Sequence, residues 1–279
     1  MNNNQQNVLI TGATSGIGFE LAKIFATNGY NLVIVARSHE GLANTASELS
    51  SEFGVTVTPI VMDLFEKDAA REVYEIVLEK GIRIDILVND AGQGVYGEFT
   101  ETDLDREMDI IQLNICSLVG FTKYFLKDMV SRSNGKILNV TSIAGKVPGP
   151  WHSVYHATKA FAHSFTEAIR EEVREKGIVV TSLLPGATQT DFFNKAGMNA
   201  SKIVQEGDLA NPADVAKDGY EALMNGDDMV VSGFGNKMQV INSNIMPDAL
   251  VAASVRKMQA PVEEEDEKGV LADSLASRN

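Results

Sequence analysis

The sequence predicts a single-domain α/β fold, a doubly wound parallel β-sheet of about seven strands with helices on both faces. Short runs rich in β-branched residues alternate with longer amphipathic stretches, which is typical of parallel strands joined by helices. A glycine-rich turn at residues 11–18 separates the first strand from the first helix, as in the first unit of many such sheets. The chain of 279 residues, 44% of them hydrophobic, is long enough to bury one large core.

Each predicted strand is a short β-branched run, and each predicted helix is an amphipathic stretch that follows a strand or loop. In chain order the strands are Asn7–Thr11, Asn31–Ala36, Val55–Val61, Ile84–Val88, Lys136–Val140, Ile178–Leu184 and Met229–Val231. The helices are Gly16–Asn28, Glu40–Glu52, Lys67–Glu79, Asp103–Val130, Ser153–Lys176, Pro212–Met224 and Lys237–Met258. Pro247 is expected to break the last helix, because proline has no backbone N–H to donate.

Some segments fall outside this alternation. Residues 1–6 are expected to be a flexible N-terminus, and residues 7–258 the domain. The stretch from Pro185 to Ala210 is rich in Gly, Asn, Thr and Asp but also carries large apolar residues, so a mobile lid is predicted at residues 187–210. Residues 259–279 contain the run Glu-Glu-Glu-Asp-Glu-Lys, and an acidic, disordered tail is expected there.

The charge balance and cysteine content exclude some classes of partner and compartment. The chain has 24 Lys and Arg against 38 Asp and Glu, a formal net charge of −14, and such an acidic surface repels nucleic acid and anionic membranes. Cys116 is the only cysteine, so no intrachain disulfide is expected. The sequence has neither a signal-peptide pattern nor an apolar run of about 18 residues. A cytoplasmic protein is therefore expected.

Tyr155 and Lys159 are four residues apart on a predicted helix, and residues at this spacing share one helical face. A phenol has a pKa of about 10 and acts near neutral pH only when a positive charge stabilises its anion. Moving that pKa toward 7 requires about 4 kcal/mol, which a nearby ammonium in a partly desolvated cleft can supply. The pair indicates acid–base chemistry, although alone it also fits ordinary packing with a snorkelling amine.

Gly12, Gly16 and Gly18 lie between the first strand and the first helix. A helix N-terminus offers unpaired N–H groups, and glycine lets the backbone approach a phosphate closely. The position predicts a site for a dinucleotide pyrophosphate; the alternative is an ordinary tight turn.

At the end of the second strand, Ala-Arg-Ser at 36–38 leaves room for a ribose 2′-phosphate and offers a guanidinium to pair with it. This favours NADP(H) over NAD(H) as the cofactor. The alternative is that Arg37 is an ordinary solvent-exposed arginine at the end of a strand.

The ordered set of motifs resembles the short-chain dehydrogenase/reductase family across residues 7–235. The resemblance rests on Thr-Gly-x-x-x-Gly-Ile-Gly, Asn-Asp-Ala-Gly at 89–92, Asn114, Ser142, Tyr155 with Lys159, and Pro185-Gly186. It implies a Rossmann-type fold, a homodimer or homotetramer, and a small-molecule carbonyl or alcohol substrate. Asp90 departs from the family, which usually has a second asparagine there, and a local packing change is expected.

The resemblance also implies a role for each matched residue. Tyr155 exchanges a proton with the substrate oxygen, Lys159 lowers the tyrosine pKa and holds the nicotinamide ribose, and Ser142 hydrogen-bonds the substrate oxygen. Asn114 interrupts the fourth helix and helps to hold a water that relays protons. The implied cofactor contacts are Gly12, Thr14, Ser15, Gly16, Ile17, Gly18, Arg37, Ser38, Asp63, Leu64, Asn89, Ala91, Gly92, Tyr155, Lys159, Pro185, Gly186, Thr188 and Thr190.

Taken one at a time, several of these residues have simpler explanations. Ser142 fits a strand-end turn, Asn114 a helix surface and Asp63 a turn former. His152 and His156 are spaced i, i+4, but no third ligand accompanies them, so they are predicted to be helix-surface histidines and no metal site is expected. Trp151 and Tyr96 fit either the rim of a substrate pocket or ordinary packing.

Together the motifs predict an NADP(H)-dependent oxidoreductase that interconverts a carbonyl and an alcohol, with Tyr155 as proton donor and acceptor. The apolar lid residues Phe192, Phe193 and Met198 indicate a substrate with some hydrophobic body. The alternative is an NADP(H)-binding sensor or interaction protein without turnover. The intact catalytic set favours the enzyme, because a sensor does not need it.

Overall fold

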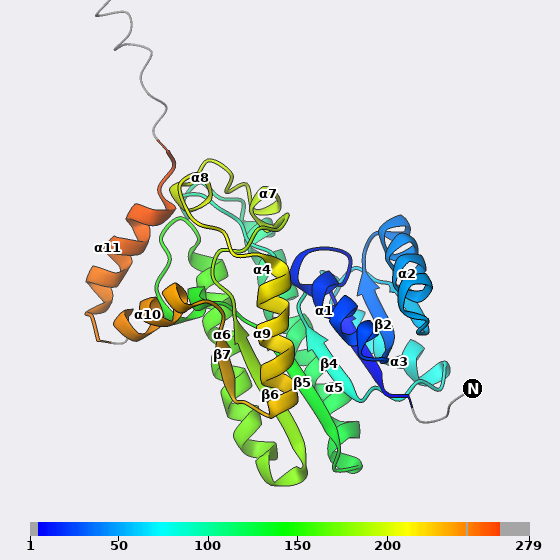
Figure 1. Cartoon of the computed structure of the whole chain (residues 1–279). Helices are drawn as coiled ribbons and strands as arrows, with labels where there is room; N and C mark the ends of the chain where they lie inside the picture. Colours follow the sequence, from blue (N-terminus) through cyan, green and yellow to red (C-terminus); the bar gives the residue numbers. More distant parts are fainter. Residues whose placement is uncertain (1–4, 244, 263–279) are drawn as a thin grey trace, which may run out of the picture.

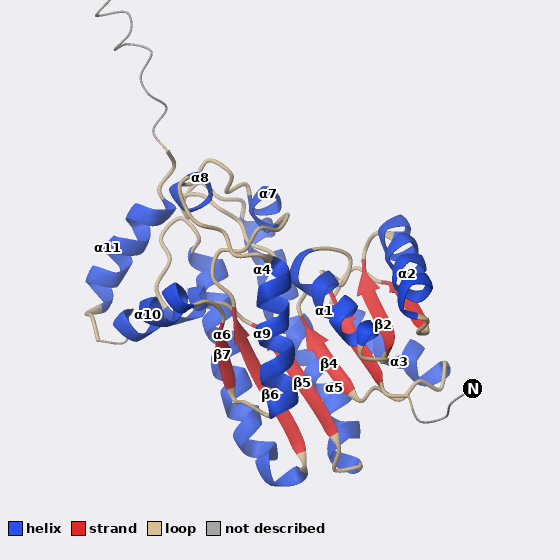
Figure 2. Cartoon of the chain, in the orientation of Figure 1, coloured by secondary structure: helices blue, strands red, loops and turns tan. Residues whose placement is uncertain are grey.

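Seven parallel strands, all within the described residues 5–243 and 245–262, form one sheet in the order β3-β2-β1-β4-β5-β6-β7. Helices cover both faces of this sheet in the computed structural model (Figure 1; Figure 2). The strands are β1 (Asn7–Thr11), β2 (Asn31–Ala36), β3 (Val57–Val61), β4 (Ile86–Asn89), β5 (Gly135–Val140), β6 (Ile178–Leu184) and β7 (Met229–Val231). The predicted fold class is confirmed. The strand order reverses between β1 and β4, and open α/β sheets form their ligand crevice at such a point.

The helices connect these strands and extend beyond them. They are α1 (Gly16–Thr27), α2 (His39–Phe53), α3 (Ala69–Glu79), α4 (Leu104–Ile111), α5 (Leu118–Ser131), α6 (Ser153–Val173), α7 (Phe192–Ala196), α8 (Lys202–Gln205), α9 (Pro212–Asn225), α10 (Phe234–Ser243) and α11 (Asp248–Gln259). Shorter turns are the π-helix η1 (Gln112–Ser117) and the 3₁₀ helices η2 (Ile143–Lys146) and η3 (Arg174–Lys176).

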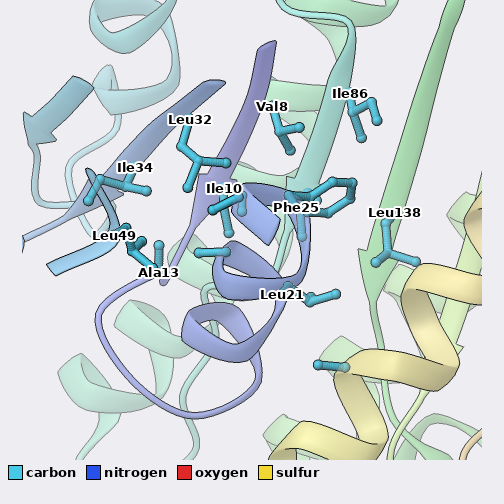
Figure 3. Packing of buried hydrophobic residues seen from close by; sticks show 14 of the residues in the cluster. Val8, Ile10, Ala13, Leu21, Phe25, Leu32, Ile34, Leu49, Ile86 and Leu138 are labelled. Carbon is cyan, nitrogen blue, oxygen red and sulfur yellow. The ribbon is translucent and has the colours of Figure 1, made fainter. Parts of the chain in front are cut away.

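The core lies in two layers, one on each face of the sheet. Successive strand residues point to opposite faces, so Val8 and Ile10 pack beneath α1 with Phe25 (Figure 3). Leu9 and Val33 face the other way and pack against side chains of α3, α5 and α6. Burial on both faces explains why the strands are continuous apolar runs.

Two predicted helices are interrupted. The helix expected over Asp103–Val130 is α4 followed by η1 and α5, and the i→i+5 turns of η1 insert one π-helical segment at Asn114. The predicted break at Pro247 is confirmed, because α10 ends at Ser243 and Pro247 is the N-cap residue of α11.

The C-terminal boundary of the domain lies later than predicted. Gln259, placed in the tail by the sequence, is the last residue of α11. The next residues pair with the lid, since Lys202 N donates to Ala260 O (2.9 Å) and Val262 N donates to Ala200 O (2.8 Å). We call residues 259–262 the strap and residues 187–210 the lid. Most of the predicted N-terminal segment (residues 1–4) and the rest of the predicted tail (residues 263–279) lie outside the described residues.

Candidate active site

A cavity of about 690 Å³ lies at the carboxyl ends of the strands, where the residues that follow β1, β2, β4, β5 and β6 form its walls. The predicted site residues that line it are Gly12, Thr14, Ser15, Gly16, Ile17, Arg37, Ser38, Asp63, Leu64, Ala91, Gly92, Ser142, Tyr155, Lys159, Pro185, Gly186, Thr188 and Thr190. Gly18, Asn89 and Asn114 do not line it. The fold therefore brings most of the predicted residues together.

The glycine-rich turn forms a cradle, a space next to the backbone that a side chain at Gly12 or Gly16 would fill. Gly12 and Gly16 have positive φ values of 76° and 58°, a backbone conformation that glycine adopts without strain. A Cβ on Gly12 would lie 3.0 Å from the Ala91 nitrogen, and one on Gly16 would lie 2.8 Å from Thr190 Cγ2. The N-cap residue Ser15 makes no side-chain hydrogen bond to the first turn of α1. The cradle and the unpaired N–H groups of this helix fit a dinucleotide phosphate.

The far end of the cavity holds Arg37. Its guanidinium lies 3.8 Å from the Asp63 carboxylate and 4.9 Å from the centre of the Phe65 ring. The Ser38 hydroxyl accepts a hydrogen bond from Gly41 N (3.0 Å) and caps α2. Arg37 is therefore held at the rim, half-exposed, with a cationic group available to an anion.

The three predicted residues that do not line the cavity support it from behind. A Cβ on Gly18 would lie 2.5 Å from the Gly12 carbonyl oxygen, so this glycine allows close helix–strand packing. Asn89, one of the implied cofactor contacts, donates from Nδ2 to Asn139 Oδ1 (2.8 Å) within the core. Asn114 donates to Gln93 O (2.9 Å) and to Thr158 on α6 (3.0 Å). Sequence pattern alone does not separate such supporting residues from contact residues.

Ser142, Tyr155 and Lys159 meet at the other end of the cavity. Ser142 begins the turn after β5, and its Oγ accepts from Ala144 N (3.0 Å). Lys159 Nζ donates to Val140 O (2.9 Å) and lies 5.8 Å from the centre of the Tyr155 ring. The predicted i, i+4 arrangement on one helix thus places a phenol, an ammonium and a hydroxyl around the same space.

The pKa values in this cluster are dominated by burial. Burial raises the pKa of Tyr155 to about 12, while a hydrogen bond with Ser142 lowers it and the charge of Asp90 raises it. Burial lowers the pKa of Lys159 to about 8, and Asp90 opposes this shift. Desolvation thus outweighs the hydrogen bond that lowers the pKa of Tyr155. The lowering of this pKa by Lys159 stays a prediction.

The histidines beside Tyr155 are buried, which corrects the prediction of a helix surface. His152 is 3% exposed and His156 is 5% exposed. Burial, reinforced by His156, lowers the pKa of His152 to about 3. The Phe192 ring lies 5.0 Å from the Tyr155 ring, and Trp151 stacks on Tyr96. Both histidines line the cavity, which the i, i+4 spacing does not reveal.

The strap closes the substrate end of the cavity, and the sequence did not predict this. Gln259 Nε2 lies 2.8 Å from His156 Nε2, and the Tyr96 hydroxyl donates to Gln259 O at 2.5 Å. Since His156 Nδ1 lies 2.9 Å from Val147 O and donates to it, its Nε2 accepts from Gln259. Val255, Met258 and Gln259 line the cavity. Tyr96, by contrast, is not a lining residue: it holds the strap from behind.

Within residues 5–243 and 245–262, no group of three or more His, Cys, Asp or Glu side chains is arranged to hold a metal ion. Among the helices of the same ranges, none combines the length and apolarity needed to cross a membrane.

Comparison with known proteins places the chain in a family. The model of the short chain dehydrogenases matches residues 6–200. The very-long-chain 3-oxoacyl-CoA reductase of Anas platyrhynchos is 38% identical over 181 residues, which are 63% of this chain and 58% of that protein. An uncharacterized oxidoreductase of Staphylococcus saprophyticus is 32% identical over 205 residues, 74% of this chain and 88% of that protein. The chain thus matches little more than half the length of the first relative.

A solved structure agrees with this placement. The short-chain dehydrogenase from Sphingobium yanoikuyae in complex with NADPH superposes with a TM-score of 0.78 at 28% identity, covering 93% of this chain and all of that one. The chain belongs to the short-chain dehydrogenase/reductase family, which confirms the resemblance.

Proposed function

We propose that the protein is an NADP(H)-dependent oxidoreductase that interconverts a carbonyl and an alcohol, with Tyr155 as the group that exchanges the proton. The observation that carries the proposal is one cavity with a glycine cradle at one end and Ser142, Tyr155 and Lys159 at the other. A bound nicotinamide cofactor supplies or accepts the hydride. The protein's own residues then have to orient the substrate and manage one proton.

The protonation states suit the direction of carbonyl reduction. With a pKa of about 12, Tyr155 holds its proton at neutral pH and can donate it. With a pKa of about 8, Lys159 is largely cationic at pH 7 and stabilises the phenolate that donation leaves behind. Ser142 Oγ, held by the Ala144 N–H, is positioned to hydrogen-bond the same substrate oxygen. In alcohol oxidation the tyrosine acts in reverse, as the base.

Arg37 supports the choice of NADP(H). Its guanidinium lies at the cavity rim after β2, where a carboxylate would instead favour a free ribose hydroxyl. The Asp63 partner at 3.8 Å is a long, half-exposed contact that a 2′-phosphate can replace. The NADPH-bound relative from Sphingobium yanoikuyae adds support from a protein of the same family.

The substrate end of the cavity supports a carbonyl compound with a hydrophobic body. Its walls include Val147, Phe192, Met198, Val255 and Met258. Such a wall offers apolar surface to bury and few groups that fix a strongly polar molecule. The 3-oxoacyl-CoA reductases among the relatives act on substrates of that general kind by name.

The proposal is tested by NADPH consumption with purified protein and a panel of aldehydes and ketones of increasing apolar size. We expect saturable turnover on part of the panel and its loss, with NADPH binding retained, in Tyr155→Phe. A matched control is Tyr74→Phe, which removes a hydroxyl from α3 outside the cavity. Saturable NADPH binding without turnover on any compound would instead support the sensor.

A further inference from the structure

Asp90 is a partly buried ionisable residue that the proposed mechanism does not use. It lies in the turn after β4, where its backbone N–H donates to Thr11 Oγ1 (3.1 Å), and it lines the cavity. Its carboxyl accepts a hydrogen bond from Gly18 N. Asp90 Oδ2 and the Gly12 carbonyl oxygen both lie 2.5 Å from the point that a Gly18 Cβ would occupy. The carboxyl is thus packed directly beneath the glycine-rich turn.

This environment suits a protonated carboxyl better than an ionised one. A buried carboxylate is acceptor-only, and a carbonyl oxygen nearby offers it no hydrogen. A protonated carboxyl can accept from Gly18 N and still offer one O–H, as the side-chain amide of an asparagine does. Burial raises the pKa of Asp90 to about 7, while Lys159 and the Gly18 hydrogen bond lower it. Burial thus favours the neutral form of this carboxyl.

The ionisable groups that interact with Asp90 are on α6. Its negative charge raises the pKa of Lys159 and raises the pKa of Tyr155. The other elements packed around it contribute neutral groups: the Thr11 hydroxyl from β1 and the backbone of Gly12 and Gly18 from the turn and α1. Asp90 is thus the acidic neighbour of the catalytic pair.

We propose that Asp90 is a positioning residue that sets the protonation balance of the Tyr155–Lys159 pair, and that its carboxylate takes up a proton when a dinucleotide binds in the glycine cradle. The proposal rests on the proposed cofactor site. Phosphate charges brought against Gly12 and Gly16 disfavour a carboxylate buried behind the same turn. The proton comes from solvent, and no bond other than the new O–H is formed.

The first test measures proton uptake directly and needs no turnover. NADPH is titrated into the protein by calorimetry at pH 7.5 in buffers of different ionisation enthalpy, which gives the number of protons bound. The cofactor's own 2′-phosphate also titrates, near pH 6, so the readout is the difference between wild type and Asp90→Asn. We expect the wild type to take up a measurable fraction of a proton more than the variant.

Asp85→Asn is the control for removing an acidic side chain next to β4, because Asp85, which is 3% exposed, precedes the strand at its opposite end. It should behave as the wild type does. Asp90→Ser is a second neutral variant, should Asp90→Asn fail to fold. Equal proton uptake in the wild type and both neutral variants would overturn the proposal.

The second test is the pH profile of turnover on any substrate found in the panel. Because Asp90 is proposed to be protonated once the dinucleotide is bound, its charge acts in the free enzyme. Asp90→Asn should therefore change the pH dependence of kcat/KM for NADPH, which reports the free enzyme, and leave the pH dependence of kcat unchanged. A purely structural role would lower both parameters at every pH alike, and coincident kcat/KM profiles of the variant and the wild type would count against the proposal. Absence of turnover throughout would reject the proposed function, whereas the calorimetry would still decide the role of Asp90.

Discussion

The imidazole ring of His152 lies parallel to the phenol ring of Tyr155, with centroids 4.4 Å apart and planes 12° apart. His152 precedes α6 as its N-cap residue, and Tyr155 is in the first turn of that helix. The stack therefore restricts the orientation of the phenol, and hence of the proton that it is proposed to exchange.

His152→Ala should lower kcat by roughly tenfold to a hundredfold, since small misplacements of a reacting group have effects of that order. His152→Phe keeps a flat ring against Tyr155 and should retain most of the activity. Steady-state kinetics of both variants on one ketone provide the measurement. Equal losses would show that the imidazole nitrogens, and not the stacked ring, are required.

His152 should also make the protein less stable in acid. Its pKa is lowered from 6.5 to about 3 by burial, so between those values the unfolded chain binds a proton that the folded protein does not. Stability then rises with pH through this window and is fully present above about pH 6.5. Urea unfolding at pH 4.5 and pH 7 should show a smaller difference for His152→Phe than for the wild type. An unchanged difference would assign the acid sensitivity to other groups.

Arg37→Ala should weaken NADPH binding by about tenfold to a hundredfold, the effect of losing one hydrogen bond to a charged group. NADH binding should change little, because NADH has no 2′-phosphate. Fluorescence titration with both cofactors tests this, and Arg71→Ala, which removes an ion-paired arginine from α3, is the control. Equal losses for both cofactors would refute the assignment of Arg37 to the 2′-phosphate.

Two truncations should separate the strap from the residues after it. Deleting residues 263–279 should leave kcat and KM unchanged. Deleting 259–279 also removes the Gln259 partner of His156, and KM should rise by about tenfold, the cost of leaving a buried polar group unpaired. Gln259→Leu should reproduce much of that rise. A normal KM after the longer deletion would show that the strap does not shape the pocket.

The features that follow from local sequence were predictable. The turn from β1 to α1 depends on glycines a few residues apart, and the Tyr155–Lys159 pair depends on the geometry of one helix. The contact between Gln259 and His156 joins residues 103 positions apart, and no local pattern indicates it. Asn89 is of a residue type common in ligand-binding turns, but its Nδ2 donates to Asn139 Oδ1 in the core. Only the packing of β4 against β5 decides whether Asn89 contacts a ligand or supports the core.

At Asp90 the sequence identified an unusual residue, but it did not indicate how that residue would affect the protonation of the site. The departure from the family's asparagine was visible, yet the chemistry depends on how closely Gly12 and Gly18 surround the carboxyl. The π-helical turn η1 is similar: the resemblance placed an interruption at Asn114, while the uninterrupted apolar pattern favoured one long helix.

Much of the wall around the substrate end comes from the lid, α11 and the strap, all of them downstream of β6, and Val147 joins it from the segment after β5. The glycine cradle and the proton-handling residues come from upstream. Substitutions in these three segments should therefore alter which molecules the substrate end accommodates, while Ser142, Tyr155 and Lys159 keep their positions.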